Sequence, residues 1–229
     1  ASSASAMLDF SVPAGERASL PSQQRVAIVT GSFDQTIDGV ALTLNRLAAH
    51  LLRRGHAVLV LCPGAPGRPL ALRPAARVVR VPSVPLPVWS EYRLTWGLGR
   101  SAARALADFS PSVIHVAVPD AMGSAALHWA RRRGIPALCS HHTRWGAYLD
   151  YYPSLPARYL LRRLSWWHLK RFHAQCAVTL PPSVAVKLEL EAHGVGRVVV
   201  WPRGVDTDLF SPKWKLFSPK WKRRLEAWP

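Results

Sequence analysis

The chain has 229 residues, of which 49% are hydrophobic, so it can bury the core of one ordinary domain. A formal net charge of +17 favours an anionic partner: nucleic acid, a phosphorylated substrate or an acidic lipid surface. No apolar run approaches the roughly 20 residues that cross a bilayer, so no segment is predicted to span a membrane.

The three cysteines, Cys62, Cys139 and Cys176, each border an apolar run, and their spacing is not that of a metal site. They are predicted to be small core residues in a reducing compartment and not disulfide partners.

Residues 1–24 are small, polar and turn-prone, which predicts a disordered leader. A remnant of an Ala/Ser-rich transit peptide is the alternative, although an Arg-rich amphipathic pattern is missing.

From Arg25 on, the small polar residues give way to apolar runs and an amphipathic segment. RVAIVTG predicts a buried strand, GVALTLNRLAAHLLRRG a helix with one apolar face, and AVLVLC a second strand. Together they form a βαβ unit.

The same alternation continues along the chain. Further strands are predicted at 77–82, 112–118, 135–140, 176–180 and 197–202, and helices at 94–109, 121–134, 156–174 and 181–194. Apolar strands that alternate with amphipathic helices predict an α/β fold, a Rossmann-like doubly wound parallel sheet. It is predicted as a single domain over residues 25–206, with ligands at the carboxyl ends of its strands.

Three loops after strands could carry chemistry. In GSFDQTIDGV, Gly39 opens a helix whose free amides attract phosphate, although an ordinary turn glycine is the alternative. SHHTRWGAYLDYY combines histidine, arginine and aromatic rings. It is either a sugar or phosphate site or a polar loop with a packed aromatic cluster, and it shows no further ligands for a metal site. VPSVPLPVWSEYRL is either a functional loop or a surface crossover.

The predicted helix ARYLLRRLSWWHLKRFH has five basic residues and no acidic one. Such a helix can lie on an anionic membrane or pack on the sheet with a solvated basic face. The residues predicted for the membrane surface are Arg162, Arg163, Trp166 and Lys170.

Several segments in fixed order resemble the N-terminal half of family 4 glycosyltransferases. They are TGSFDQTIDGVALTLNRL, VPSVPLPVWSEYRL, IHVAVPDAMGSAAL, GIPALCSHHTRWGAYLDYY and VVVWPRGVDTDLFSP. The likeness covers about residues 25–212 and is strongest to the branch with GDP-mannose-dependent α-mannosyltransferases and sulfoquinovosyldiacylglycerol synthases. It implies the acceptor-side half of a GT-B fold.

The resemblance also implies roles for individual residues. The Gly39 amide would lie against the donor diphosphate, and His142 would contact the transferred sugar near the reaction centre. Other residues would line the donor cleft (Thr143, Arg144 and Arg203) or the acceptor side (Glu91, Tyr92, Arg93 and Asp120).

The implied reaction is retaining transfer of a hexose, mannosyl-like, from a GDP- or UDP-linked sugar to a lipid or glycan acceptor. No cofactor and no metal are expected; the nucleotide-sugar is the substrate. In this family the groups that grip the donor belong to a second domain, so the chain is predicted to be inactive alone. The expected location is the cytoplasm or an organelle stroma, with peripheral attachment to a membrane.

Near the end, LFSPKWK occurs twice in tandem, and residues 207–229 are interpreted as an interdomain linker with a duplicated heptad and no second domain after it. A basic lipid-touching arm is the alternative.

Two other functions stay open for the chain: a non-catalytic membrane-surface module, and a nucleic-acid binder that uses the Trp/Lys-rich tail. No specific nucleic-acid motif supports the last.

Overall fold

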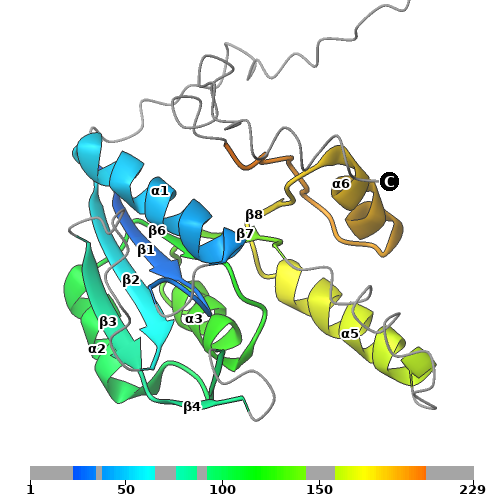
Figure 1. The fold of residues 1–229 in the computed structure, drawn as a ribbon, viewed down its shortest axis with the longest axis horizontal. Helices are drawn as coiled ribbons and strands as arrows, with labels where there is room; N and C mark the ends of the chain where they lie inside the picture. Colours follow the sequence, from blue (N-terminus) through cyan, green and yellow to red (C-terminus); the bar gives the residue numbers. More distant parts are fainter. Residues whose placement is uncertain (1–22, 35–37, 65–75, 87–91, 143–157, 205–229) are drawn as a thin grey trace, which may run out of the picture.

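The core of the protein is a parallel six-stranded sheet in the order β3-β2-β1-β6-β7-β8 (Figure 1). The computed structural model describes residues 23–34, 38–64, 76–86, 92–142 and 158–204. The strands of the sheet are β1 (Arg25–Val29), β2 (Ala57–Pro63), β3 (Arg77–Val81), β6 (Val113–Val116), β7 (Ala137–Ser140) and β8 (Val178–Leu180). The predicted α/β architecture with a doubly wound parallel sheet is therefore confirmed.

Helices cover both faces of this sheet because the strands are apolar on both sides. The helices are α1 (Gly39–Arg53), α2 (Gly99–Phe109), α3 (Ala121–Arg131), α5 (Arg158–His173) and α6 (Val184–Ala192). On one face, Leu44 and Ala48 of α1 pack on Ile28 and Val60. On the other, residues of α2 and α3 pack on Ala27, Val29, Leu59 and Leu61.

Two local predictions fail at the ends of elements. The strand expected at 197–202 is a single parallel bridge between Thr179 and Val198. The helix expected from Leu94 begins only at Gly99. Gly97 and Gly99 have φ angles of 133° and 67°, so the backbone does not enter the right-handed helical region until after Gly99. Ahead of it lies an unpredicted antiparallel pair, β4 (Ser83–Pro85) and β5 (Arg93–Thr95).

The prediction that all three cysteines are unpaired was wrong. Cys139 at the end of β7 and Cys176 in the turn before β8 form a disulfide, with their Cα atoms 6.1 Å apart. The two cysteines are separated by 37 positions in sequence, which hid the pairing. It arises because β7 and β8 are neighbours in the sheet. Cys62 is buried and takes no part in a disulfide, as expected.

The helix α5 extends away from the sheet (Figure 1). Its last turn joins the core through Leu169 and Phe172, whereas Leu160, Leu164 and Trp167 are at least half exposed. Among the described residues, no helix has both the length and the apolar character that a membrane span needs.

Candidate functional site

The carboxyl ends of β1, β6 and β7 are neighbours in the sheet, and the groups that follow them meet at one edge. After β1 comes α1, whose N-cap is Asp38: its carboxylate accepts hydrogen bonds from the amides of Val40 (2.8 Å) and Ala41 (2.7 Å). The amide of Gly39 is not among those that this carboxylate caps. The edge therefore presents the positive end of a helix, as the sequence predicts.

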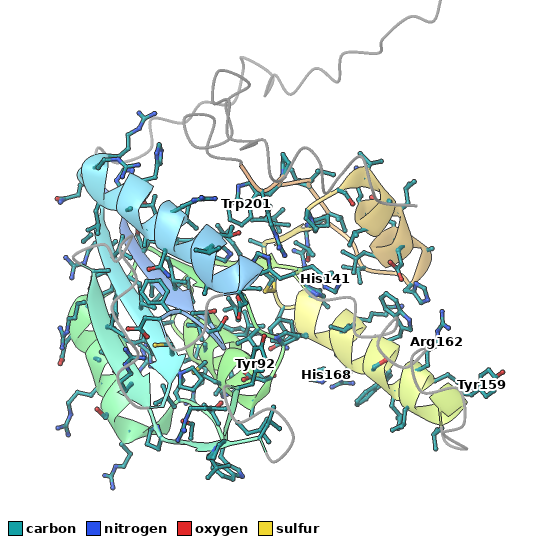
Figure 2. The ribbon with its side chains drawn as sticks, in the orientation of Figure 1. Tyr92, His141, Tyr159, Arg162, His168 and Trp201 are labelled. Carbon is teal, nitrogen blue, oxygen red and sulfur yellow. A yellow bond between two sulfur atoms is a disulfide. The ribbon has the colours of Figure 1, made fainter. Side chains whose placement is uncertain are left out.

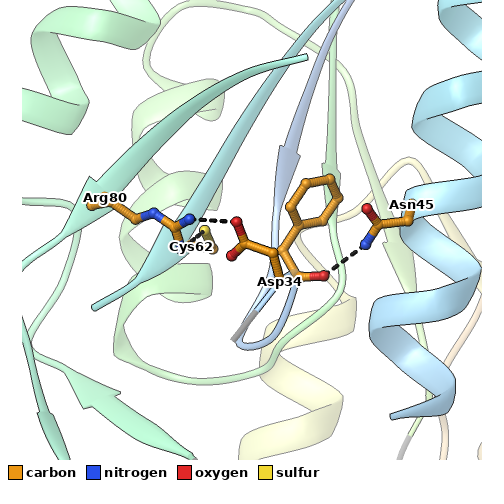
Figure 3. A network of polar contacts seen from close by, with 5 residues as sticks. Asp34, Asn45, Cys62 and Arg80 are labelled. Atoms are coloured by element: carbon orange, nitrogen blue, oxygen red, sulfur yellow. Dashed lines mark hydrogen bonds and ion pairs between the residues drawn. The ribbon is translucent and has the colours of Figure 1, made fainter. Parts of the chain in front are cut away.

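Two contacts hold the first described residues after β1, as Figure 3 shows. The carboxylate of Asp34, which is fully buried, forms an ion pair of 2.5 Å with Arg80 of β3. The side-chain amide of Asn45 in α1 donates a 2.6 Å hydrogen bond to the carbonyl of Phe33. These contacts hold Phe33 and Asp34, the described start of the loop, against α1 and β3.

The loop after β7 begins with a chain of side-chain hydrogen bonds. The hydroxyl of Ser140 lies 2.7 Å from Nε2 of His142 and 2.8 Å from Nε2 of His115, the latter on β6. Burial lowers the pKa of His115 to about 4, and burial together with the Arg203 guanidinium lowers the pKa of His142 to about 3. Both imidazoles are therefore neutral near pH 7.

Arg203 completes this edge from the far end of the described chain. Its Nη2 lies 3.2 Å from Nδ1 of His142 and 3.3 Å from the His142 carbonyl oxygen. Its Nη1 lies 3.0 Å from the place that a Cβ on Gly39 would occupy. Three of the predicted site residues, Gly39, His142 and Arg203, are thus brought together.

Backbone hydrogen bonds hold the segment before Arg203 alongside β8 and the residue that follows it. The amide of Val199 donates to Thr179 (2.9 Å), and that of Trp201 donates to Pro181 (2.8 Å). The indole of Trp201 then meets the rings of His115 and His142 edge-on, with centroids 5.7 and 6.4 Å away. Figure 2 shows Trp201 beside the N-terminal end of α1.

The hydrogen bonds among these residues have a defined direction. A guanidinium only donates, so Nδ1 of His142 must accept from Arg203, and the ring proton of neutral His142 lies on Nε2. That proton is donated to Ser140, whose own hydroxyl proton then goes to His115. The edge is a one-way chain from Arg203 to His115, with a cation at its exposed end.

Other predicted site residues are placed differently. Asp120 caps α3 by accepting a 2.8 Å bond from the Gly123 amide, and burial raises its pKa. Arg93 donates to the Ser83 hydroxyl (2.9 Å) and carbonyl (2.8 Å), which ties β5 to β4. Tyr92 is 40% exposed next to it. Glu91, Thr143, Arg144 and the repeated tail lie outside the described residues.

The predicted membrane-surface residues separate into two groups. Arg162, Arg163 and Lys170 are exposed on α5, and Figure 2 shows Arg162 and Tyr159 toward the end that lies far from the sheet. Trp166 is instead partly buried against α6, where its ring stacks on that of His193 with centroids 3.6 Å apart. It belongs to the contact between the two helices.

Sequence reasoning missed Ser140, His115 and Trp201. His115 lies inside the strand predicted at 112–118 and Ser140 ends the strand predicted at 135–140, but neither position is a specific signal for a site. Trp201 falls within the strand predicted at 197–202.

A small pocket is lined by His142 together with His141 and His173. His173, Cys139 and Cys176 are a group of described residues that could hold a metal ion.

Comparisons with known proteins identify the family of the chain. Residues 37–209 match the model of Glycosyltransferase Family 4. The chain is 36% identical over 191 residues to a GDP-mannose-dependent alpha-mannosyltransferase of Mycobacterium tuberculosis, covering 82% of this chain and 49% of that protein. It is 30% identical to the sulfoquinovosyl transferase SQD2 of Arabidopsis thaliana over 61% of this chain and 27% of that protein.

A solved structure, that of UDP-GlcNAc 2-epimerase from Neisseria meningitidis bound to UDP-GlcNAc, matches with 18% identity and a TM-score of 0.48, covering 88% of this chain and 53% of that chain. The chain spans about half the length of the mannosyltransferase relatives it matches. The family match covers the edge that holds Gly39, His142 and Arg203, and the chain belongs to glycosyltransferase family 4.

Proposed function

We propose that this chain is the acceptor-side half of a retaining hexosyltransferase, which moves a mannosyl-like group from a GDP- or UDP-linked sugar to a lipid or glycan. The observation that carries the proposal is the convergence of Gly39, His142 and Arg203 at the carboxyl edge of the sheet. The mannosyl group is inferred from the relatives, one of which is a GDP-mannose-dependent alpha-mannosyltransferase 36% identical to this chain. The epimerase structure contributes nothing to this choice.

In this proposal the residues act by position and charge. The guanidinium of Arg203 and the uncapped Gly39 amide bind the donor diphosphate, because both offer donors to anionic oxygens at a helix N-terminus. Negative charge builds up on this leaving group as the sugar departs, so the fixed donors stabilise the transition state. When Arg203 turns to the diphosphate, Nδ1 of neutral His142 can accept a hydrogen bond from a sugar hydroxyl without adding a charge of its own.

The proposed activity needs a donor-binding domain of the family 4 type, within the same polypeptide or supplied in trans. We therefore expect the chain alone to show no transfer. The test joins this chain to the second half of the Mycobacterium tuberculosis relative and measures transfer of labelled sugar from GDP-mannose and, separately, from UDP-glucose to a lipid extract and to soluble mannosides.

Transfer by this chimera, lost in His142→Ala and Arg203→Ala but kept in His128→Ala, is the expected result. His128 is exposed on α3 and serves as the matched histidine control. A folded chimera that transfers no sugar, or an Arg203→Ala chimera as active as its parent, would contradict the proposal. The preferred donor and acceptor follow from the same assay.

A second candidate function, attachment to a membrane surface, rests on α5. Leu160, Leu164 and Trp167 are 60%, 50% and 59% exposed, and Arg162 and Arg163 are exposed on the same helix. Exposed apolar side chains beside cations are typical of a helix that lies in the headgroup region of an anionic bilayer. Such attachment would suit a lipid acceptor and would make the enzyme peripheral.

Vesicle co-sedimentation tests this attachment. Binding is expected on vesicles of phosphatidylglycerol and not on phosphatidylcholine alone, and Leu160→Gln should weaken it. Leu188→Gln on α6 is the matched control, since Leu188 is also 60% exposed. Equal loss of binding in both variants, or binding that ignores lipid charge, would argue against a role for α5.

A further inference from the structure

Three side chains that commonly bind soft metal ions meet under the sheet edge. Cys139 is the next-to-last residue of β7, His173 ends α5, and Cys176 lies in the turn that follows α5. One ligand atom of each lies within 4.8 Å of the others. All three residues are at most 3% exposed, so the cluster is sealed from bulk water.

The histidine of this cluster is only half satisfied. Nδ1 of His173 lies 3.2 Å from the hydroxyl of Thr179, while Nε2 is buried and has no hydrogen-bond partner among the described residues. A buried nitrogen without a partner costs free energy, so it requires an explanation. A neutral imidazole that donates Nδ1–H to Thr179 presents the lone pair of Nε2, which is how metal-binding histidines are usually oriented.

We propose that the reduced protein binds one Zn²⁺ through the thiolates of Cys139 and Cys176 and the imidazole of His173. Two thiolates and one imidazole form a ligand set that zinc prefers, and the metal would satisfy the orphaned nitrogen. His141 is a candidate for the fourth ligand, since its ring centroid lies 5.5 Å from that of His173.

The disulfide and the zinc site exclude each other. A dithiol reductant breaks the bond between the two protein sulfurs by giving up two electrons, and its own sulfurs become a disulfide. The two protein thiols then lose two protons to solvent as Zn²⁺ binds. The sequence alone predicts no such site because the ligands come from a strand, a helix end and a turn.

The cluster also borders the proposed donor site. Cys139 directly precedes Ser140, the hydroxyl that links His115 and His142. His173 and His142 line the same small pocket. Either bridge, sulfur or metal, would tie the end of α5 to the strand from which His142 emerges.

The test uses the whole chain, reduced, stripped of metal by a chelator and kept without oxygen. Zinc is titrated against a chromophoric indicator, and cobalt(II) replaces zinc to reveal thiolate ligation by its charge-transfer absorption. We expect one equivalent bound by the reduced chain and none by the oxidised chain. Cys62→Ser is the matched control: Cys62 is equally buried but packs on the opposite face of the sheet.

Cys176→Ser and His173→Gln should lose stoichiometric binding and the cobalt–thiolate band. Thr179→Val should weaken binding by roughly 10- to 100-fold, because the Thr179 hydroxyl orients the His173 ring. Circular dichroism identifies variants that fail to fold; Thr179→Val and His173→Gln both leave the cysteines in place. Overturning results are no zinc bound by the reduced chain, or equal zinc affinity in the reduced parent and Cys176→Ser.

Discussion

At the residue scale, Arg203 explains why position 39 is a glycine. The φ angle of Gly39 is not among the positive ones, so its backbone would accept another residue. Space is what limits it, since a Cβ would come within 3.0 Å of the Arg203 guanidinium. The glycine allows a cation to lie against the start of α1.

We therefore predict that Gly39→Ala hardly changes stability but weakens donor binding. Alanine is favoured over glycine in helices by up to about 1 kcal/mol, which offsets the push on a flexible side chain. Urea unfolding should shift little, whereas the KM for the nucleotide-sugar in the chimera should rise several-fold. An unchanged KM would mean that the backbone near residue 39 is not approached by the donor.

Gly123 is a glycine of the opposite kind. A Cβ there would lie 1.9 Å from the carbonyl oxygen of Val118, a backbone atom that cannot move aside. We predict that Gly123→Ala destabilises the protein by at least about 2 kcal/mol, near the upper range for overpacking. Gly196→Ala, with nothing within 4 Å, is the control in urea unfolding and should change little. Equal midpoints for the two variants would contradict this reading.

At the element scale, the ion pair between Asp34 and Arg80 couples β3 to the loop after β1. Asp34 is fully buried in its side chain, and Arg80 is 21% exposed. Arg80→Met would leave a buried carboxylate without its guanidinium, a change that typically costs roughly 3–5 kcal/mol. The double variant Asp34→Asn/Arg80→Met should recover part of this loss. A double variant no more stable than Arg80→Met would show that the pair is not coupled.

Elements also show what the sequence could and could not predict. Strands β1, β2, β6 and β7 are short apolar runs closed by turn residues, and they appear where expected. The β4–β5 pair was missed because β4 contains Pro85 and follows Pro82, and because each strand has only three residues. The hydrogen-bond chain from Arg203 to His115 spans 88 residues of sequence, so only the tertiary fold brings it together.

At the scale of the whole molecule, stability should depend on pH through histidines that are folded in their neutral form. Burial lowers the pKa of His115 to about 4, against roughly 6.5 in an unfolded chain. Between these values the unfolded chain binds a proton that the folded chain does not. The stabilisation is therefore complete above about pH 6.5 and is lost as pH falls toward 4.

His142, with a pKa of about 3, adds a second proton to the same window. The free energy of unfolding should fall by about 1.4 kcal/mol per pH unit for each such histidine. We predict that His115→Gln reduces this slope between pH 6 and pH 4.5 by up to one proton, as measured by urea unfolding at several pH values. An identical slope in parent and variant would contradict the buried neutral state of His115.

The one-way chain of hydrogen bonds at the sheet edge has a consequence for how a ligand could be detected. If a phosphate draws Arg203 away, Nδ1 of His142 loses its donor, and the tautomers of His142 and His115 are no longer dictated from outside. His115 is 4% exposed and would never touch the ligand. The chemical shifts of the ring nitrogens of His115 should nevertheless change when a ligand binds at the edge that Gly39, His142 and Arg203 form.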